Sequence, residues 1–270
     1  MKVGVVLAVV TTLLAAACGN DQQDDSAGGS TSTTRAESNV VEVAATEYVY
    51  EMPEAVTGGV VTFDFSNQGA QPHEFAFVRL DDGKTVDDLK AAFEMRREPK
   101  WARDLAGVPV LSPGGSTAMT RELEPGSYAF FCFLPAPDGM PHIAHGMIEG
   151  FDVSDESDAQ VPAADFVISV TEEGFSVPDV PAGRSTVELR NEGRRPHEFA
   201  ILSFEAGKKE RDLGKWFNSG YKGETPALFP GGIQAIGPGE SVVMEIDFVA
   251  GRTYTVEDFP NDLRSKFIVR

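Results

Sequence analysis

Basic residues and histidine are scarce in this 270-residue sequence, which has 23 lysines and arginines against 42 aspartates and glutamates and only four histidines. The formal net charge is -19. Such an acidic chain repels nucleic acid and anionic membrane surfaces, so we expect neither as a partner. The sequence also lacks a Ser-His-Asp nucleophile set and a glycine-rich phosphate loop, and no small-molecule substrate is expected.

Cysteine is rarer still, because Cys18 and Cys132 are the only two. Cys18 follows a lysine, an apolar run over residues 3–14 and three alanines. This pattern predicts an export signal that is too short for a spanning helix. Its end resembles a bacterial lipobox, with the usual leucine one position early at Leu14. We predict a lipoprotein signal peptide over 1–18 with lipidation at Cys18, and ordinary secretion is the alternative.

The segment after the predicted lipid site holds almost nothing apolar. Residues 19–39 consist mainly of serine, threonine, glycine, aspartate and glutamine, which cannot form a core, so we predict a flexible tether. The folded part is expected to begin near Val40. The protein is then expected to be exported and held by the lipid at Cys18, at the outer face of the cytoplasmic membrane or in the periplasm.

The folded part of the sequence contains an internal repeat. The segment "FSNQGAQPHEFAFVRL" at 65–80 matches "LRNEGRRPHEFAILSF" at 189–204, and flanking segments match in the same order. We therefore predict one domain over 40–154 and a second over 163–270, with a linker over 155–162.

Short alternating runs punctuated by glycine and proline occur in both copies, as at residues 60–65 and 241–248. This pattern is typical of antiparallel strands and turns. We predict an all-β fold of two tandem Greek-key β-sandwich domains. One short helix is expected to be inserted in each, over 86–96 and 211–217, because apolar residues recur there at helical spacing.

The stretch "YAFFCFLPAPDGMPHIAHGM" at 128–147 concentrates the rare residues Cys132, His142 and His145 with Met147. If Cys18 carries lipid, Cys132 has no disulfide partner, so its thiol is either buried and inert or held by a metal. A thiolate, two imidazoles and a weak axial thioether suit copper in an electron-transfer site. An upstream histidine on a neighbouring strand, His73, is the candidate for the fourth ligand.

The first copy resembles the cupredoxin (type 1 blue copper) family. It has an asparagine-containing turn before "PHEF", the strand "GSYAFFC", and a loop that carries a histidine before Gly-Met. The long loop with "PDGMPH" is similar to that in the first domain of copper nitrite reductases. The resemblance implies a cupredoxin-like domain that binds one type 1 copper. If this copper transfers electrons, His142 is expected to face the surface and to be the electron exit. The implied ligands are His73, Cys132, His142 and axial Met147.

Three further residues are candidates for a supporting role around the copper. His142 is favoured over His145 as the ligand because it keeps the family's usual spacing to Met147, so His145 is assigned a hydrogen bond near the site or exposure to solvent. Asn67 and Phe131 are the other candidates for contacts around the ligands.

The second copy resembles the same fold but lacks the ligands. It keeps "PHEF" with His197, whereas the position of the cysteine falls on Asp258 and no histidine or methionine follows. "PHEF" can therefore exist for structural reasons alone, and a buried cysteine is often only a small apolar residue. The copper hypothesis depends on the four residues of the first copy in combination.

Two classes of function remain open. Copper oxidases and nitrite reductases need further histidine-rich centres, but no His-x-His pair is present and Phe131 stands directly before Cys132 where nitrite reductases have a histidine. We therefore expect no enzyme. We predict a membrane-tethered, extracytoplasmic blue copper protein that transfers single electrons to a redox protein or membrane oxidoreductase, with residues 135–141 as an apolar docking rim. The alternative is a copper-handling or partner-binding scaffold lipoprotein.

Overall fold

The computed structural model describes residues 39–95, 97 and 99–270. The predicted signal peptide, the lipid site at Cys18 and all but the last residue of the predicted tether lie outside these residues. Within them, no helix is both long and apolar enough to cross a membrane.

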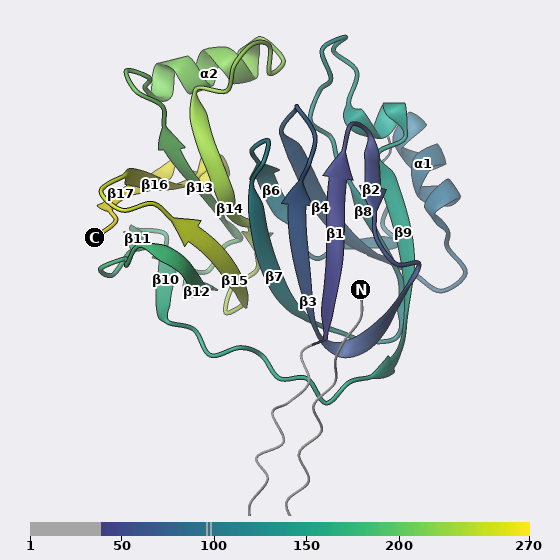
Figure 1. The fold of residues 1–270 in the computed structure, drawn as a ribbon. Coiled ribbons are helices and arrows are strands. Elements are labelled where there is room, and N and C mark those ends of the chain that lie inside the picture. The colour runs from purple at the N-terminus through teal and green to yellow at the C-terminus, as the bar shows by residue number, and fades with distance from the viewer. Residues whose placement is uncertain (1–38, 96, 98) are drawn as a thin grey trace, which may run out of the picture. The chain divides into compact units, whose positions relative to one another are not determined.

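The first copy is built from nine strands and one α-helix (Figure 1). The strands are β1 (Val40–Thr46), β2 (Val49–Glu51), β3 (Ala55–Asn67), β4 (His73–Leu80), β5 (Ala102–Asp104), β6 (Val108–Leu111), β7 (Ser116–Leu123), β8 (Gly126–Phe131) and β9 (Ile148–Glu156). The helix α1 (Val86–Glu94) lies between β4 and β5, and the short 3-10 helix η1 (His142–His145) lies between β8 and β9.

The second copy repeats this order with eight strands and the helix α2 (Glu210–Asn218). Its strands are β10 (Phe166–Thr171), β11 (Gly174–Ser176), β12 (Gly183–Asn191), β13 (His197–Phe204), β14 (Ala227–Ile236), β15 (Ser241–Phe248), β16 (Thr253–Asp258) and β17 (Leu263–Ile268), and η2 (Phe259–Asn261) follows β16. The predicted all-β class and the inserted helix in each copy are confirmed. The helices differ from their predicted bounds by one or two residues.

Each copy is a sandwich of two sheets. In the second copy, β11-β10-β12-β15 face β14-β13-β16-β17. In the first copy, the long strand β3 belongs to both layers, because it pairs with β9 at its start and with β1 and β7 further on. Gly58 and Gly59 lie at this change of partner, and the positive φ of Gly59 suits glycine. The strand β9 runs to Glu156, so the predicted linker begins inside a strand.

Backbone pairing joins the two copies. The strand β15 of the second copy lies antiparallel to β7 of the first, with Met244 opposite Met119. The Thr117 hydroxyl adds a hydrogen bond of 2.9 Å to the carbonyl of Glu245. The repeats are therefore continuous through one sheet, a connection that the sequence analysis did not predict.

Aromatic side chains fill the first core just below the end of β8. Phe130 packs edge-on against Phe63 at a ring distance of 5.2 Å and stacks on Phe77 at 4.6 Å. All three are fully buried, and such burial contributes about 1.5–3 kcal/mol for each side chain. This packing fixes β8 up to Phe131, the residue before Cys132.

The helix α1 covers the opposite face of β8. The Thr85 hydroxyl accepts a hydrogen bond from the backbone of Asp88, whose carboxylate accepts one from the Thr85 backbone, which fixes the start of the helix. Leu89 and Ala92 are buried against a second apolar cluster that includes Phe131. Side chains alternate across a strand, so Phe130 faces the core while Phe131 faces α1.

A glycine-to-alanine pair tests the tight packing between strands. A Cβ atom at Gly107 would lie 1.8 Å from the carbonyl oxygen of Phe75, whereas one at Gly214, within α2, would meet nothing within 4 Å. We expect Gly107→Ala to lower the free energy of unfolding by about 3 kcal/mol or more, because the backbone must move. Gly214→Ala is expected to raise it by about 0.5–1 kcal/mol. Urea unfolding of both variants measures this, and equal effects would contradict the close contact at Gly107.

Candidate metal centre

Two neighbouring strands and one loop supply the predicted ligands. His73 is the first residue of β4, and Cys132 directly follows β8, which pairs with β4 through Ala76 opposite Phe131. The loop after Cys132 returns to it, because the Cys132 amide donates to the carbonyl of Met147 and the Ile143 amide donates to that of Cys132. This places η1 directly over the end of β8.

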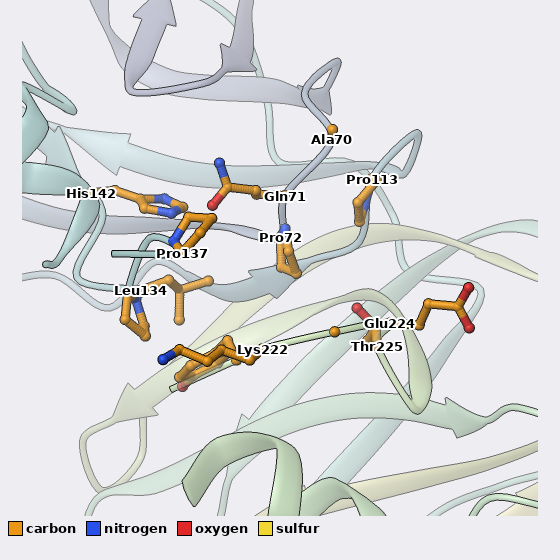
Figure 2. A pocket seen from close by; sticks show the side chains of 13 residues that line it. Ala70, Gln71, Pro72, Pro113, Leu134, Pro137, His142, Lys222, Glu224 and Thr225 are labelled. Atoms are coloured by element: carbon orange, nitrogen blue, oxygen red, sulfur yellow. The ribbon is translucent and has the colours of Figure 1, made fainter. Parts of the chain in front are cut away.

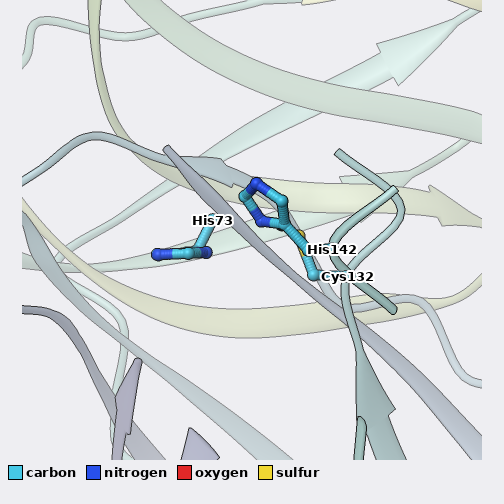
Figure 3. Close-up of side chains that lie close together, drawn as sticks. All are labelled: His73, Cys132 and His142. Atoms are coloured by element: carbon cyan, nitrogen blue, oxygen red, sulfur yellow. The ribbon is translucent and has the colours of Figure 1, made fainter. Parts of the chain in front are cut away.

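Three of the predicted ligands form one buried group (Figure 3). The candidate ligand atoms of His73, Cys132 and His142 lie within 4.8 Å of one another. His142 Nδ1 is 3.3 Å from Cys132 Sγ, and the two imidazole ring centres are 5.0 Å apart. The three side chains are at most 1% exposed. Met147 is also fully buried, and its amide donates to the carbonyl of His142.

The imidazoles of this group lack the partners that buried polar atoms normally have. Neither nitrogen of His73 has a hydrogen-bond partner, and His142 Nε2 has none either. Leaving a buried donor or acceptor unpaired costs about 1–3 kcal/mol each. A metal ion bound by one nitrogen of each ring removes part of this cost. Two imidazoles, a thiol and a nearby buried methionine are the donor set that suits copper.

The surroundings prepare these groups for a metal. Burial, and to a smaller extent the nearby His142, lowers the pKa of His73 to about 4. Burial and the nearby His145 likewise lower the pKa of His142 to about 4. Both rings are therefore neutral at pH 7. Burial raises the pKa of the Cys132 thiol, so a metal must displace a proton from the sulfur when it binds.

The supporting residues differ in their distance from the group. The Asn67 side chain donates to the carbonyls of Gln71 and Leu111 and accepts from the Gly69 amide, so it holds the turn before His73. His145 lies outside the group, with its Nε2 3.1 Å from Asp138 Oδ2. The Phe131 ring packs against Phe93 of α1, away from the ligands.

The sequence analysis missed Tyr48 and Glu74. The Tyr48 ring meets His142 edge-on at 5.1 Å and stacks on His145 at 4.5 Å. The Glu74 amide donates to Cys132 Sγ at 3.3 Å. The repeated "PHEF" could have signalled Glu74, because an acidic residue on a buried strand needs partners, whereas no local pattern marks Tyr48.

The expectation that His142 faces the surface is wrong. Its ring is 1% exposed and lies in the wall of a cavity of about 370 Å³ (Figure 2). Gln71 and Pro137 lie beside His142, and residues 221–225 of the second copy form the other wall. The second copy thus narrows the approach to the ligand, which a reading of the first copy alone does not reveal.

The second copy places a salt bridge where the first has the metal group. His197 Nδ1 lies 2.6 Å from Asp258 Oδ2, and both side chains are fully buried. The strand register makes Asp258 equivalent to Cys132, because Glu257 lies opposite Ala200 as Phe131 lies opposite Ala76. The carboxylate supplies the partner that His73 lacks, so this copy holds its histidine without a metal.

No protein-family model matches the chain, and no curated protein sequence matches it. Among solved structures, it is similar to dithionite-reduced auracyanin from Roseiflexus castenholzii (26% identity over 43% of this chain and 98% of that one, TM-score 0.31). It is also similar to auracyanin A, a blue copper protein from Chloroflexus aurantiacus (19% identity, 43% and 98%, TM-score 0.30). Copper nitrite reductase from Nitrosomonas europaea matches along more of the chain (15% identity, 87% and 94%, TM-score 0.26).

The evidence for copper in this chain comes from its own residues, because the two imidazoles and the thiol that the resemblance implied converge in the structure. The first copy therefore brings together a buried donor set that suits copper.

A half-buried carboxyl in the second copy gives a pH-dependent prediction. Desolvation, together with the carboxylates of Asp258 and Glu74, raises the pKa of Glu198 to about 7. The folded state therefore holds this proton more tightly than the unfolded state, and stability falls as the pH rises from about 4.5 to 7. We expect Glu198→Gln to raise the free energy of unfolding of the copper-free protein more at pH 8 than at pH 5, by on the order of 2 kcal/mol. Urea unfolding at both pH values measures this, and an equal effect at both would contradict it.

Proposed function

We propose that this chain is a blue copper protein that transfers single electrons. The observation that carries the proposal is the convergence of His73, Cys132 and His142 into one buried group, with Met147 beside it. Copper bound there supplies one-electron exchange between its cuprous and cupric states. The donor set suits both states, since thiolate and thioether favour the first and imidazole suits the second.

The residues around the group keep the ligands in place during such an exchange. His73 is anchored through the turn that Asn67 holds, and Cys132 and His142 are tied to the same loop by backbone hydrogen bonds. Burial of all three side chains excludes water from the group. Ligands that stay in position lower the reorganisation that each electron transfer requires.

The remaining histidines support a carrier rather than an enzyme. A catalytic copper centre of the oxidase or nitrite reductase type would need further imidazoles. His145 contacts Asp138, and His197 is paired with Asp258 inside the second copy. Among the residues that the structure describes, His73, Cys132 and His142 form the one group with metal-ligand spacing.

The proposed setting is outside the cytoplasm. A lipid on Cys18 and a tether over 19–39 would hold the carrier near membrane oxidoreductases and raise its local concentration there. The proposed partner is a redox protein that docks around the loop over 135–141, where Met140 is 52% exposed. The alternative scaffold function gains less support, because a copper carrier that releases its metal needs accessible ligands.

Visible absorption and EPR spectra of the copper-loaded protein test the proposal. We expect an intense thiolate-to-copper band in the wild-type protein and its loss in Cys132→Ser, because the band requires the sulfur. The spectra and a titration with an outer-sphere reductant then establish whether the bound copper cycles between its two states. A colourless protein, or copper that cannot be reduced and reoxidised, would refute the electron-transfer function.

The repeated motif provides a matched control for this experiment. His73→Gln is expected to abolish the blue band, because it removes a ligand from the buried group. His197→Gln changes the same position of the second copy and is expected to leave the band unchanged. Copper should also raise the melting temperature of the wild-type protein and of His197→Gln, but not that of Cys132→Ser. Equal loss of the band in both histidine variants would contradict the assignment of the ligands.

A further inference from the structure

One residue of the first copy, Glu74, contacts both Cys132 and the residue that follows it. The Glu74 amide donates to Cys132 Sγ, and Glu74 Oε2 accepts the amide of Phe133 at 2.7 Å. The Tyr50 hydroxyl donates to the Glu74 carbonyl. The Glu74 carboxylate therefore holds the amide of the residue after Cys132, while the backbone amide of Glu74 contacts the sulfur itself.

The free oxygen of this carboxylate is held by the second copy. Gln234 Nε2 donates to Glu74 Oε1 at 2.7 Å, across 160 residues of sequence. The rest of the glutamine is also committed, because its Oε1 accepts the amide of Gly107 at 3.0 Å and its own amide donates to the Gly107 carbonyl at 2.8 Å. Gln234 is thereby fixed to the first copy at three points, and its amide can point only at Glu74.

The equivalent position of the first copy holds no such residue. Val108 lies opposite Phe75 on β4, as Ile233 lies opposite Phe199 on β13, so Pro109 is the equivalent of Gln234. Proline has no side-chain donor and cannot hold the glutamate of the other copy. Of the two copies, the second therefore carries this side-chain amide and the first does not. The amide points at Glu74 of the first copy, which contacts Cys132.

We propose that Gln234 is a positioning residue through which the second copy sets the geometry and reduction potential of the copper site in the first. This inference rests on the proposed function and gives the metal-free copy a role within it. A hydrogen bond to the cysteine sulfur withdraws electron density from it and favours the reduced metal, and such bonds tune the potential of blue copper sites. Gln234 acts on this bond by fixing the carboxylate of the residue that donates it.

Substitutions of Gln234 in the full chain test this role. Gln234→Leu removes the amide at nearly constant volume, and Gln234→Glu keeps an acceptor for Gly107 but replaces the amide donor to Glu74 with a second carboxyl group. For both we expect a shifted thiolate-to-copper band, a lower reduction potential and a copper affinity weaker by about tenfold, as is typical when a residue that orients a ligand is lost. Copper-loaded spectra, a redox titration and competition with a chelator measure these changes.

A reversed pair distinguishes positioning from a general loss of structure. In the double variant Glu74→Gln with Gln234→Glu, the amide and the carboxylate exchange places and the hydrogen bond can form again. We expect this variant to recover the band and most of the copper affinity. Ser203→Ala removes two other hydrogen bonds of the second copy, one from the Ser203 hydroxyl to the Thr253 carbonyl and one from Arg252 to that hydroxyl. It should lower stability while leaving the band and the potential at their wild-type values.

The outcomes separate this inference from the proposed function. Wild-type spectra and affinity in both single variants, or no recovery in the reversed pair, would overturn the role of Gln234 and leave the blue copper function intact. If the wild-type protein shows no blue band, the copper function fails, and the reaction rate of the Cys132 thiol with a disulfide reagent in the copper-free protein decides the positioning role. The positioning role is supported if Cys132 reacts severalfold faster in Gln234→Glu and at the wild-type rate in the reversed pair. An unchanged rate in Gln234→Glu refutes it. If Gln234→Leu does not fold, the comparison of Gln234→Glu with the reversed pair remains decisive.

Discussion

A buried imidazole needs a partner, and the rest of this structure depends on how each copy meets that need. The backbone presents a histidine at the start of β4 and again at the start of β13, both fully buried. In the second copy, Asp258 supplies the partner within the chain. In the first copy, the facing residue is Cys132, whose thiol is a weak hydrogen-bonding group, and both nitrogens of His73 stay unpaired. The same backbone therefore gives a histidine paired with a carboxylate in the second copy and an unpaired set of metal-binding side chains in the first.

The backbone is the same because the turn before each histidine is built in the same way. Asn191 donates to the carbonyls of Arg195 and Ile236 and accepts from the Gly193 amide, as Asn67 does at the equivalent positions. A Cβ atom at Gly193 or at Gly69 would lie under 3.0 Å from the histidine that follows. These asparagines and glycines thus belong to the scaffold, and their repetition says nothing about metal. The chemistry is decided by the residue directly after β8, Cys132, and by the last residue of β16, Asp258.

The features predictable from the sequence are those that neighbouring residues determine. Alternating apolar runs predicted the strands, and the internal repeat predicted two similar copies, because both patterns are local. The candidate ligands were also predictable from the sequence, because Cys132, His142 and Met147 lie in one loop and the family resemblance added His73. Three features could not be predicted from the sequence: the pairing of β15 with β7, the burial of His142 near residues 221–225, and the hydrogen bond from Gln234 to Glu74. Each joins segments more than 75 residues apart, and neither spacing nor composition reports on such contacts.

The contacts between the copies change what the second copy means. Read alone, a repeat that has lost its ligands is a spacer, and its "PHEF" motif is a remnant of the fold. In the structure, its strand β15 extends a sheet of the first copy, its residues 221–225 line the cavity at His142, and Gln234 holds the carboxylate beside Cys132. The second and third of these contacts lie at the metal group, and the first lies along β7. The second copy needs no ion to pair His197 Nδ1, because Asp258 Oδ2 lies 2.6 Å from it. The loss of the ligands and the gain of a supporting role are therefore compatible within one backbone.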